Sequence, residues 1–305
     1  MSKIVCFGEI LIDLLAQPPA TPDTPRAFLQ YAGGAPPNVA VAASRLGADT
    51  PFAGMLGQDM FGDFLAESLA SAGVATDCIV RTDAAKTALA FVALDASGER
   101  SFSFYRPPAA DLLFRSAHFH PNCFDGTRSF HVCSNSLTEA EIADATLEGM
   151  RRARQAGAMV SLDLNLRPAL WPTGVDPLPR LWEALSLADL VKRSREELEY
   201  LAASVPGGDA AVVERLLAAQ AQAVVITAGP APIRWHTRHP HGVPTGFRVT
   251  TVDSTAAGDA FLGRLLVGIG ERGGDGAGFA AFCQAPAGSV EATPFRPARR
   301  ALAVP

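Results

Sequence analysis

Short apolar runs alternate with amphipathic segments over most of the chain. The apolar runs that predict β-strands are residues 4–7, 130–133, 159–163, 190–192 and 224–227. Segments with apolar residues at helical spacing predict helices near residues 39–46, 61–72, 139–155, 196–203 and 210–219. This alternation is typical of a parallel sheet that helices cover on both faces. A continuous apolar run, as at residues 223–226, fits a strand buried on both sides.

Two regions interrupt this alternation. Residues 13–33 are rich in proline and threonine. Residues 87–106 hold two strand-like runs around the turn-forming residues 95–99, and apolar and polar residues alternate at 101–104. This second pattern predicts a β-hairpin with one half-buried strand.

A strand-to-helix turn stands out at residues 250–262, which read Thr-Thr-Val-Asp-Ser-Thr-Ala-Ala-Gly-Asp-Ala-Phe-Leu. Small residues from Ser254 to Gly258 would let backbone amides approach a ligand closely, and the amides of the first helical turn favour negative charge. Asp259, a carboxylate inside such a site, is best explained as a base. A helix cap with small residues chosen for packing is the alternative.

This turn resembles a signature of the ribokinase-like carbohydrate kinases, Asp-Thr-Thr-(Gly/Ala)-Ala-Gly-Asp, with Ser254 as the one conservative change. A second signature of that family matches Gly-Gly-Ala-Pro-Pro-Asn-Val-Ala at residues 33–40. The resemblance implies that Asp259 takes the proton from a sugar hydroxyl. It also implies that the amides of Ala256, Ala257 and Gly258 form an anion hole for the transferred phosphoryl group.

The resemblance further implies the architecture. We expect a single domain with a ribokinase-like three-layer α/β/α sandwich, a mostly parallel central sheet and a small β-sheet lid. The lid would be formed from about residues 13–33 and 87–106 and would cover the sugar. Lids in this family often cover each other across a two-fold axis, so a homodimer is expected.

The sugar site implied by the resemblance draws on several segments. Its expected substrate-binding residues are Asp13, Gly33, Gly34, Asn38, Arg106, Asn165 and Arg167. Taken alone, Asp13 could equally be a turn residue at the end of a strand. Arg167, in the run Asp-Leu-Asn-Leu-Arg-Pro, could instead form a salt bridge with Asp163.

The nucleotide side has its own matches. Ser194, Thr227 and Gly229 match positions beside the nucleotide, and Glu197 matches the residue that orders waters around Mg²⁺. A capping box, with Ser194 as the cap, gives the same spacing, and both can hold. Asp253 and Thr255 match positions near a monovalent cation, with local hydrogen bonds to their own loop as the alternative. The expected cofactors are therefore ATP, Mg²⁺ and K⁺.

The C-terminal part departs from the family pattern. Arg264 follows Gly263 where a Gly-Gly pair is usual, and residues 282–285 replace the usual Ala-Asn element. Because this region normally contributes to the adenine and cation sites, nucleotide preference and K⁺ dependence stay open.

Charge and composition exclude several other classes of function. A net charge of −5 and a pI near 5.7 give no electrostatic reason to bind nucleic acid or an anionic membrane. The chain begins Met-Ser-Lys and then turns strand-like, which predicts no signal peptide and a cytoplasmic location. Five scattered cysteines without a Cys-x-x-Cys pair predict neither disulfides nor zinc, and the histidine groups at 118–120 and 236–241 predict no metal site.

The signatures together look most like those of bacterial fructokinases, which make D-fructose 6-phosphate. A 2-keto-3-deoxygluconate kinase is the alternative within the family, favoured slightly by the Tyr105-Arg106 pair. A non-catalytic sugar-sensing protein on the same fold is the alternative of a different class, and the presence of Asp259 disfavours it.

Overall fold

The structure is a computed structural model, and it describes residues 2–17, 21, 23, 25–94, 100–229, 231–238, 241–242 and 256–272. Its strands are β1 (Lys3–Phe7), β2 (Leu11–Ala16), β3 (Phe28–Gly33), β4 (Phe52–Gly57), β5 (Ile79–Thr82), β6 (Ala88–Leu94), β7 (Arg100–Tyr105), β8 (Thr127–Cys133), β9 (Met159–Asp163), β10 (Leu190–Ser194), β11 (Ala223–Ala228), β12 (Ala231–Thr237) and β13 (His241–Gly242). Its α-helices are α1 (Ala35–Arg45), α2 (Met60–Ser71), α3 (Ala140–Gln155), α4 (Leu178–Leu187), α5 (Arg195–Ala202), α6 (Gly208–Ala219) and α7 (Ala257–Arg272). Short 3₁₀ turns are η1 (Ala110–Leu113), η2 (Ser116–His118), η3 (Pro121–Cys123), η4 (Ser134–Leu137) and η5 (Pro168–Leu170).

The central sheet has nine strands in the order β13-β12-β11-β10-β9-β8-β1-β4-β5. Neighbours from β11 to β5 run parallel, and β12 and β13 add an antiparallel edge. The apolar runs predicted as strands form β1, β8, β9, β10 and β11 at its centre. The predicted mostly parallel sheet is confirmed.

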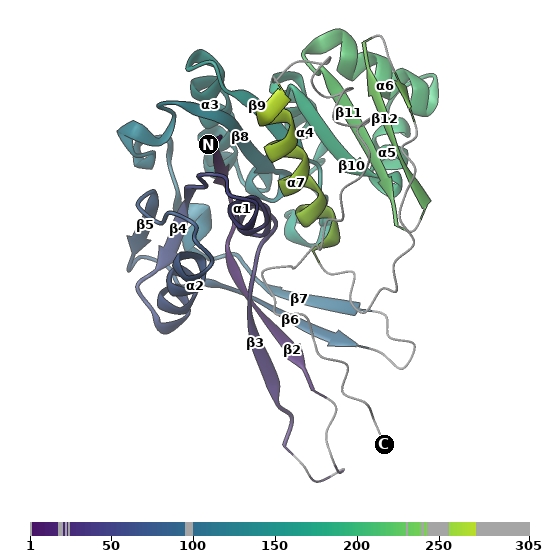
Figure 1. The fold of residues 1–305 in the computed structure, drawn as a ribbon. Coiled ribbons are helices and arrows are strands. Elements are labelled where there is room, and N and C mark those ends of the chain that lie inside the picture. Colours follow the sequence, from purple (N-terminus) through teal and green to yellow (C-terminus); the bar gives the residue numbers. More distant parts are fainter. Residues whose placement is uncertain are drawn as a thin grey trace, which may run out of the picture.

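Helices cover both faces of this sheet, which makes the predicted three layers (Figure 1). One apolar core joins the sheet to α3, α4, α5 and α6, through residues such as Met150, Leu185 and Leu216. The other core joins it to α1, α2 and α7, through residues such as Val39 and Leu265. Among the described helices, none is long and apolar enough to cross a membrane.

A second, four-stranded sheet in the order β3-β2-β6-β7 projects from one end of the central sheet (Figure 1). The β6–β7 pair is the predicted hairpin, which the antiparallel register Leu89↔Tyr105 to Leu94↔Arg100 confirms. Strand β2 runs parallel to β6 and antiparallel to β3. We call these four strands the small sheet.

Helices α1 and α7 pack against each other unusually closely. A Cβ atom added to Gly263 would lie 2.7 Å from the Cβ of Ala42 and 2.9 Å from the carbonyl oxygen of Val39. Glycine therefore permits the two backbones to approach. This approach brings the first turn of α7 beside the first turn of α1.

The four cysteines within the described residues, Cys6, Cys78, Cys123 and Cys133, are buried and free, as expected of small apolar residues. Cys283 lies outside the described residues.

Candidate active site

The two sequence signatures meet at the start of α7. The side-chain amide of Asn38 donates a hydrogen bond of 2.8 Å to Oδ2 of Asp259, across a separation of 221 positions in the sequence. The carboxylate is buried, with 8% of its residue surface exposed. A candidate sugar-binding residue and the candidate base are therefore in direct contact.

The first turn of α7 presents backbone amides. Ala256 precedes the helix in a left-handed conformation, with φ of 58°, and its carbonyl accepts the N–H of Ala260 at 2.9 Å. The amides of Ala257, Gly258 and Asp259 come before this first helical hydrogen bond. Such amides and the helix dipole attract negative charge, which is the chemistry required of the predicted anion hole.

A buried ion pair borders the same turn. Nζ of Lys192, in β10, lies 2.8 Å from Oδ2 of Asp163, at the end of β9. A Cβ atom added to Gly258 would lie 2.9 Å from this Nζ, so the ammonium lies against the candidate anion hole. The sequence analysis did not identify Lys192. Its signal was a lysine inside an otherwise apolar strand, where charged residues are seldom buried without a partner.

Burial raises the pKa of Asp259 from 3.8 to about 7, and the negative charge of Asp163 acts in the same direction. The hydrogen bond from Asn38 and the charge of Lys192 oppose the increase, and Glu9 adds to it. A carboxylate with this pKa accepts a proton readily near neutral pH and is suited to work as a general base.

The predicted sugar loop lies where β3 meets α1. A Cβ atom added to Gly33 would lie 2.6 Å from Oδ2 of Asp13, so this carboxylate packs directly on the loop. Gly34 has φ of 113°, and a Cβ atom there would lie 2.6 Å from the carbonyl oxygen of Glu9. Both the conformation and the close approach require glycine at position 34.

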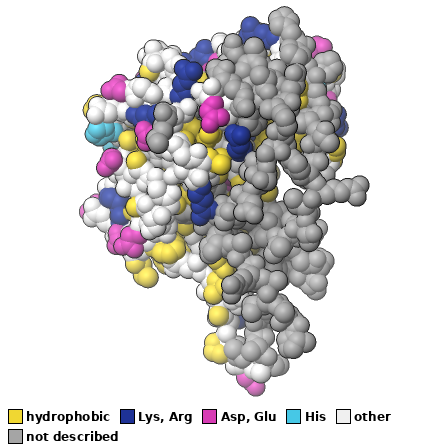
Figure 2. Space-filling view, viewed as in Figure 1, with side chains coloured by type: hydrophobic (Ala, Val, Ile, Leu, Met, Phe, Trp, Pro, Cys, Tyr) yellow, Lys and Arg dark blue, Asp and Glu magenta, His cyan; other side chains and the backbone are white. Residues whose placement is uncertain are grey.

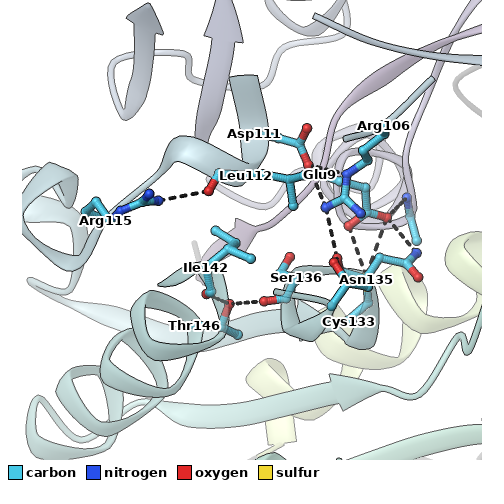
Figure 3. Close-up of polar contacts among 12 residues, drawn as sticks. Glu9, Arg106, Asp111, Leu112, Arg115, Cys133, Asn135, Ser136, Ile142 and Thr146 are labelled. Carbon is cyan, nitrogen blue, oxygen red and sulfur yellow. Dashed lines mark hydrogen bonds and ion pairs between the residues drawn. The ribbon is translucent and has the colours of Figure 1, made fainter. Parts of the chain in front are cut away.

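The carboxylate of Glu9 fixes this loop by a hydrogen bond to the start of α1. The sequence analysis did not identify Glu9. Its Oε1 accepts the backbone N–H of Ala35 at 3.2 Å and the side-chain amide of Asn135 at 3.0 Å, and the thiol of Cys133 donates to Oε2 at 3.1 Å (Figure 3). These partners come from α1, η4 and β8. No short-range pattern could have joined them.

Arg106, at the end of β7, belongs to the same cluster. Its guanidinium forms a buried ion pair with Asp111 at 2.7 Å and donates to the carbonyl of Asn135 at 2.9 Å (Figure 3). Arg106 is 4% exposed, and its described partners are Asp111 and Asn135.

Asn165 and Arg167 follow β9, as expected for the carboxyl end of a parallel strand. Asn165 has φ of 34°, a left-handed conformation that asparagine tolerates better than most residues. Arg167 is exposed. The alternative salt bridge between Arg167 and Asp163 is not formed, and Oδ2 of Asp163 pairs with Lys192 instead.

The predicted nucleotide residues lie at the ends of β10 and β11, where Ser194 and Thr227 are register partners. Ser194 caps α5, and its reciprocal hydrogen bonds with Glu197 confirm the capping box. The carboxylate of Glu197 also accepts the N–H of Leu166 at 2.8 Å. Burial and Asp163 nevertheless raise the pKa of Glu197. Gly229 has φ of 55°.

The candidate monovalent-cation residues, Asp253 and Thr255, lie outside the described residues. The part of the chain that the structure describes contains no group of three or more His, Cys, Asp or Glu side chains that could hold a metal ion.

The raised pKa of Asp259 predicts an effect on stability. An acid whose pKa is higher in the folded than in the unfolded state stabilises the fold at low pH, and this stabilisation is lost as pH rises from about 4 to 7. Asp259→Asn removes the titration, so its free energy of unfolding relative to wild type should increase between pH 5 and pH 8. A change from 3.8 to about 7 corresponds to at most about 4 kcal/mol.

Urea unfolding of both proteins at several pH values measures this difference. The matched control is Asp83→Asn, which changes an exposed carboxylate and should show no such trend. A difference between Asp259→Asn and wild type that stays constant with pH would contradict the assignment.

Comparison with known proteins places this geometry in a family. Residues 1–290 match the model of one protein family, the pfkB family of carbohydrate kinases. Fructokinase-1 of Zea mays is 40% identical over 271 residues, which cover 86% of this chain and 81% of the relative.

Solved structures agree. Fructokinase with bound ATP from Xylella fastidiosa is 58% identical, with a TM-score of 0.87 and coverage of 93% of this chain and 86% of that one. Aminoimidazole riboside kinase from Salmonella enterica is 28% identical, with a TM-score of 0.79 and coverage of 92% and 90%. With its two signatures joined at Asn38 and Asp259, the chain belongs to the pfkB family of carbohydrate kinases.

Proposed function

We propose that this kinase transfers the γ-phosphoryl group of ATP to the primary hydroxyl of D-fructose and gives D-fructose 6-phosphate. The contact between Asn38 and Asp259 carries the proposal, because it joins a sugar-binding amide to a base beside an anion site. The substrate is favoured by relatives named fructokinase at 40% and 58% identity. A cytoplasmic location is part of the proposal.

The geometry supports the following roles in the reaction. Asn38 and Asp13 would hold the sugar so that its primary hydroxyl faces Asp259, which accepts the proton as the oxygen attacks phosphorus. The amides of residues 257–259 would stabilise the charge on the transferred group. Arg106, Asn165 and Arg167 are proposed as further contacts to sugar or phosphate.

The residues present fit Mg²⁺ bound mainly through phosphate and water. Glu197 is a partly buried carboxylate that forms no ion pair among the described residues, although the charge of Lys192 acts on it. Its pKa is raised, so a nearby divalent ion would favour its charged form. Mg²⁺ commonly keeps several waters and binds nucleotide phosphates, where it neutralises charge. Ser194, Thr227 and Gly229 are proposed to contact the nucleotide, and Asp253 and Thr255 to bind K⁺.

Loss of the base should reduce turnover. Asp259→Asn should lower kcat by about 100-fold or more and leave the affinity for sugar nearly unchanged, as expected when general-base help is lost. In wild type, kcat/KM should rise with pH through about 7, because the base works only when deprotonated. Steady-state kinetics from pH 5.5 to 8.5 measure both effects. Near-normal turnover of the folded variant would remove Asp259 from the mechanism.

Substrate choice can be tested at Asp13. Asp13→Ala should mainly raise the KM for fructose, by about 10- to 150-fold, which corresponds to roughly 1.5–3 kcal/mol for a hydrogen bond to a charged group. The assay follows ADP release with fructose and with 2-keto-3-deoxygluconate, for wild type and variant.

Each outcome of that assay has a clear meaning. A wild-type preference for the keto acid would overturn the fructokinase proposal while the chain remained a sugar kinase. Binding of sugar without ADP release for any sugar tested would favour the sugar-sensing alternative.

We also propose a homodimer formed through the small sheet. Phe28, Leu29 and Phe102 on this sheet are 43–44% exposed and Tyr105 is 64% exposed, and hydrophobic side chains are visible on the projecting part of the molecule (Figure 2). Exposed apolar residues on a sheet with free edges favour association. Light scattering at micromolar concentration should give twice the chain mass of 31.9 kDa.

Phe28→Ser combined with Phe102→Ser should shift the dimer toward monomer. Val175→Ser is the matched control, because Val175 is 40% exposed but lies between η5 and α4, outside the small sheet. A monomeric wild type, or a dimer that the double variant leaves intact, would count against this interface.

A further inference from the structure

Lys192 occupies a position that the family signatures do not explain. Its Nζ lies within 3 Å of the place that a Cβ atom on Gly258 would take, and Gly258 supplies one of the amides of the candidate anion hole. The residue itself is 7% exposed and Asp163 is 1% exposed. A cation at such a place is desolvated and held by a partner, which makes its interaction with an incoming anion strong.

Three carboxylates lie close enough to Lys192 to act on its charge. Asp163, Glu197 and Asp259 all act on it electrostatically. Burial disfavours the charged ammonium, but the attraction of Asp163 and of the other two carboxylates outweighs this and raises the pKa of Lys192. The ammonium therefore stays protonated. Without it, three carboxylates would surround the place where an anionic phosphoryl group has to bind.

We propose that Lys192 is a catalytic residue that binds the transferring phosphoryl group at the first turn of α7, and that Asp163 is the positioning residue that holds the ammonium there. The inference rests on the proposed kinase reaction. During transfer, the bond from phosphorus to the leaving oxygen of ADP breaks as the bond to the sugar oxygen forms. The proton goes to Asp259, and Lys192 stays protonated throughout.

The alternative is that Lys192 only neutralises Asp163 within the fold. The two roles differ in what happens when both charges are removed together. A purely structural pair can be replaced by neutral residues with recovery of folding and activity, since only an unpaired buried charge is strongly unfavourable. A phosphoryl-binding lysine cannot be replaced in this way.

The experiment compares Lys192→Met, Asp163→Asn and the double variant Lys192→Met/Asp163→Asn, with Lys86→Met as a control at an exposed lysine. The expected loss for Lys192→Met is about 100- to 1000-fold in kcat, the effect typical of removing one donor to a developing anion, with little change in the KM for sugar. The double variant should be as stable as wild type but as inactive as Lys192→Met. Recovered activity in a stable double variant would overturn the inference.

A binding measurement supplies a readout that does not depend on turnover. Aluminium fluoride takes the place of the transferring phosphoryl group, so calorimetry of ADP, Mg²⁺ and sugar with and without it reports the transition-state site. Wild type and Lys86→Met should bind ADP more tightly with aluminium fluoride. Lys192→Met and the double variant should lose that gain and still bind ADP alone. An unchanged gain in Lys192→Met would contradict the inference.

The pH profile separates this inference from the proposed function. Lys192 lowers the pKa of Asp259, so its removal should move the acidic limb of residual kcat/KM to higher pH. If wild type phosphorylates another sugar, the substrate proposal fails and the same variants are compared with that sugar. If the acidic limb of Lys192→Met stays at the pH of the wild-type limb and turnover is retained, Lys192 has no part in the reaction, whichever sugar is used.

Discussion

The hydrogen bond between Asn38 and Asp259 is the contact on which the active site depends, because it joins two helices that are far apart in the sequence. Asn38 lies in the first turn of α1, directly after the sugar loop, and Asp259 lies in the first turn of α7. The two turns can meet only if the helix backbones approach closely. Gly263, one turn further along α7, permits that approach because a side chain there would collide with α1. A packing constraint thereby sets the distance between Asn38, the proposed sugar-binding residue, and Asp259, the proposed base.

Burial of the charged groups tunes the pKa of Asp259, and it also lowers the stability of the fold. The same low-dielectric environment that raises the pKa of Asp259 to about 7 also strengthens every charge interaction around it. Asp163 raises the pKa further, whereas Lys192, which pairs with Asp163, lowers it again. The pKa of Asp259, the proposed base, therefore depends on burial first and then on the balance of one neighbouring ion pair. A protein that needed only stability would place apolar residues here.

The sequence predicted those parts of the fold and site that local patterns encode. Continuous apolar runs identified β1, β8, β9, β10 and β11, and the spacing of Ser194 and Glu197 identified a capping box. The weaker elements were missed as local patterns: β4, β5 and β12 gave no run distinct enough, and α4 carries a proline in its first turn. Strands β2 and β3 lie in or beside residues 13–33, which the family resemblance, and not a strand pattern, assigned to the lid. Lys192 and Glu9 were missed because their partners lie on other strands and helices, and only the folded chain brings these together.

The small sheet and the sugar loop are tied to one short turn, η4. The side-chain amide of Asn135 in this turn donates to Glu9, which in turn holds the N–H of Ala35 at the start of α1. The carbonyl of the same Asn135 accepts from Arg106, at the end of β7 in the small sheet. One residue therefore links the sheet that projects from the domain to the loop predicted to bind sugar. Because these groups are buried and paired, a shift of the sheet at Arg106 would disturb the hydrogen bonds that fix the sugar loop.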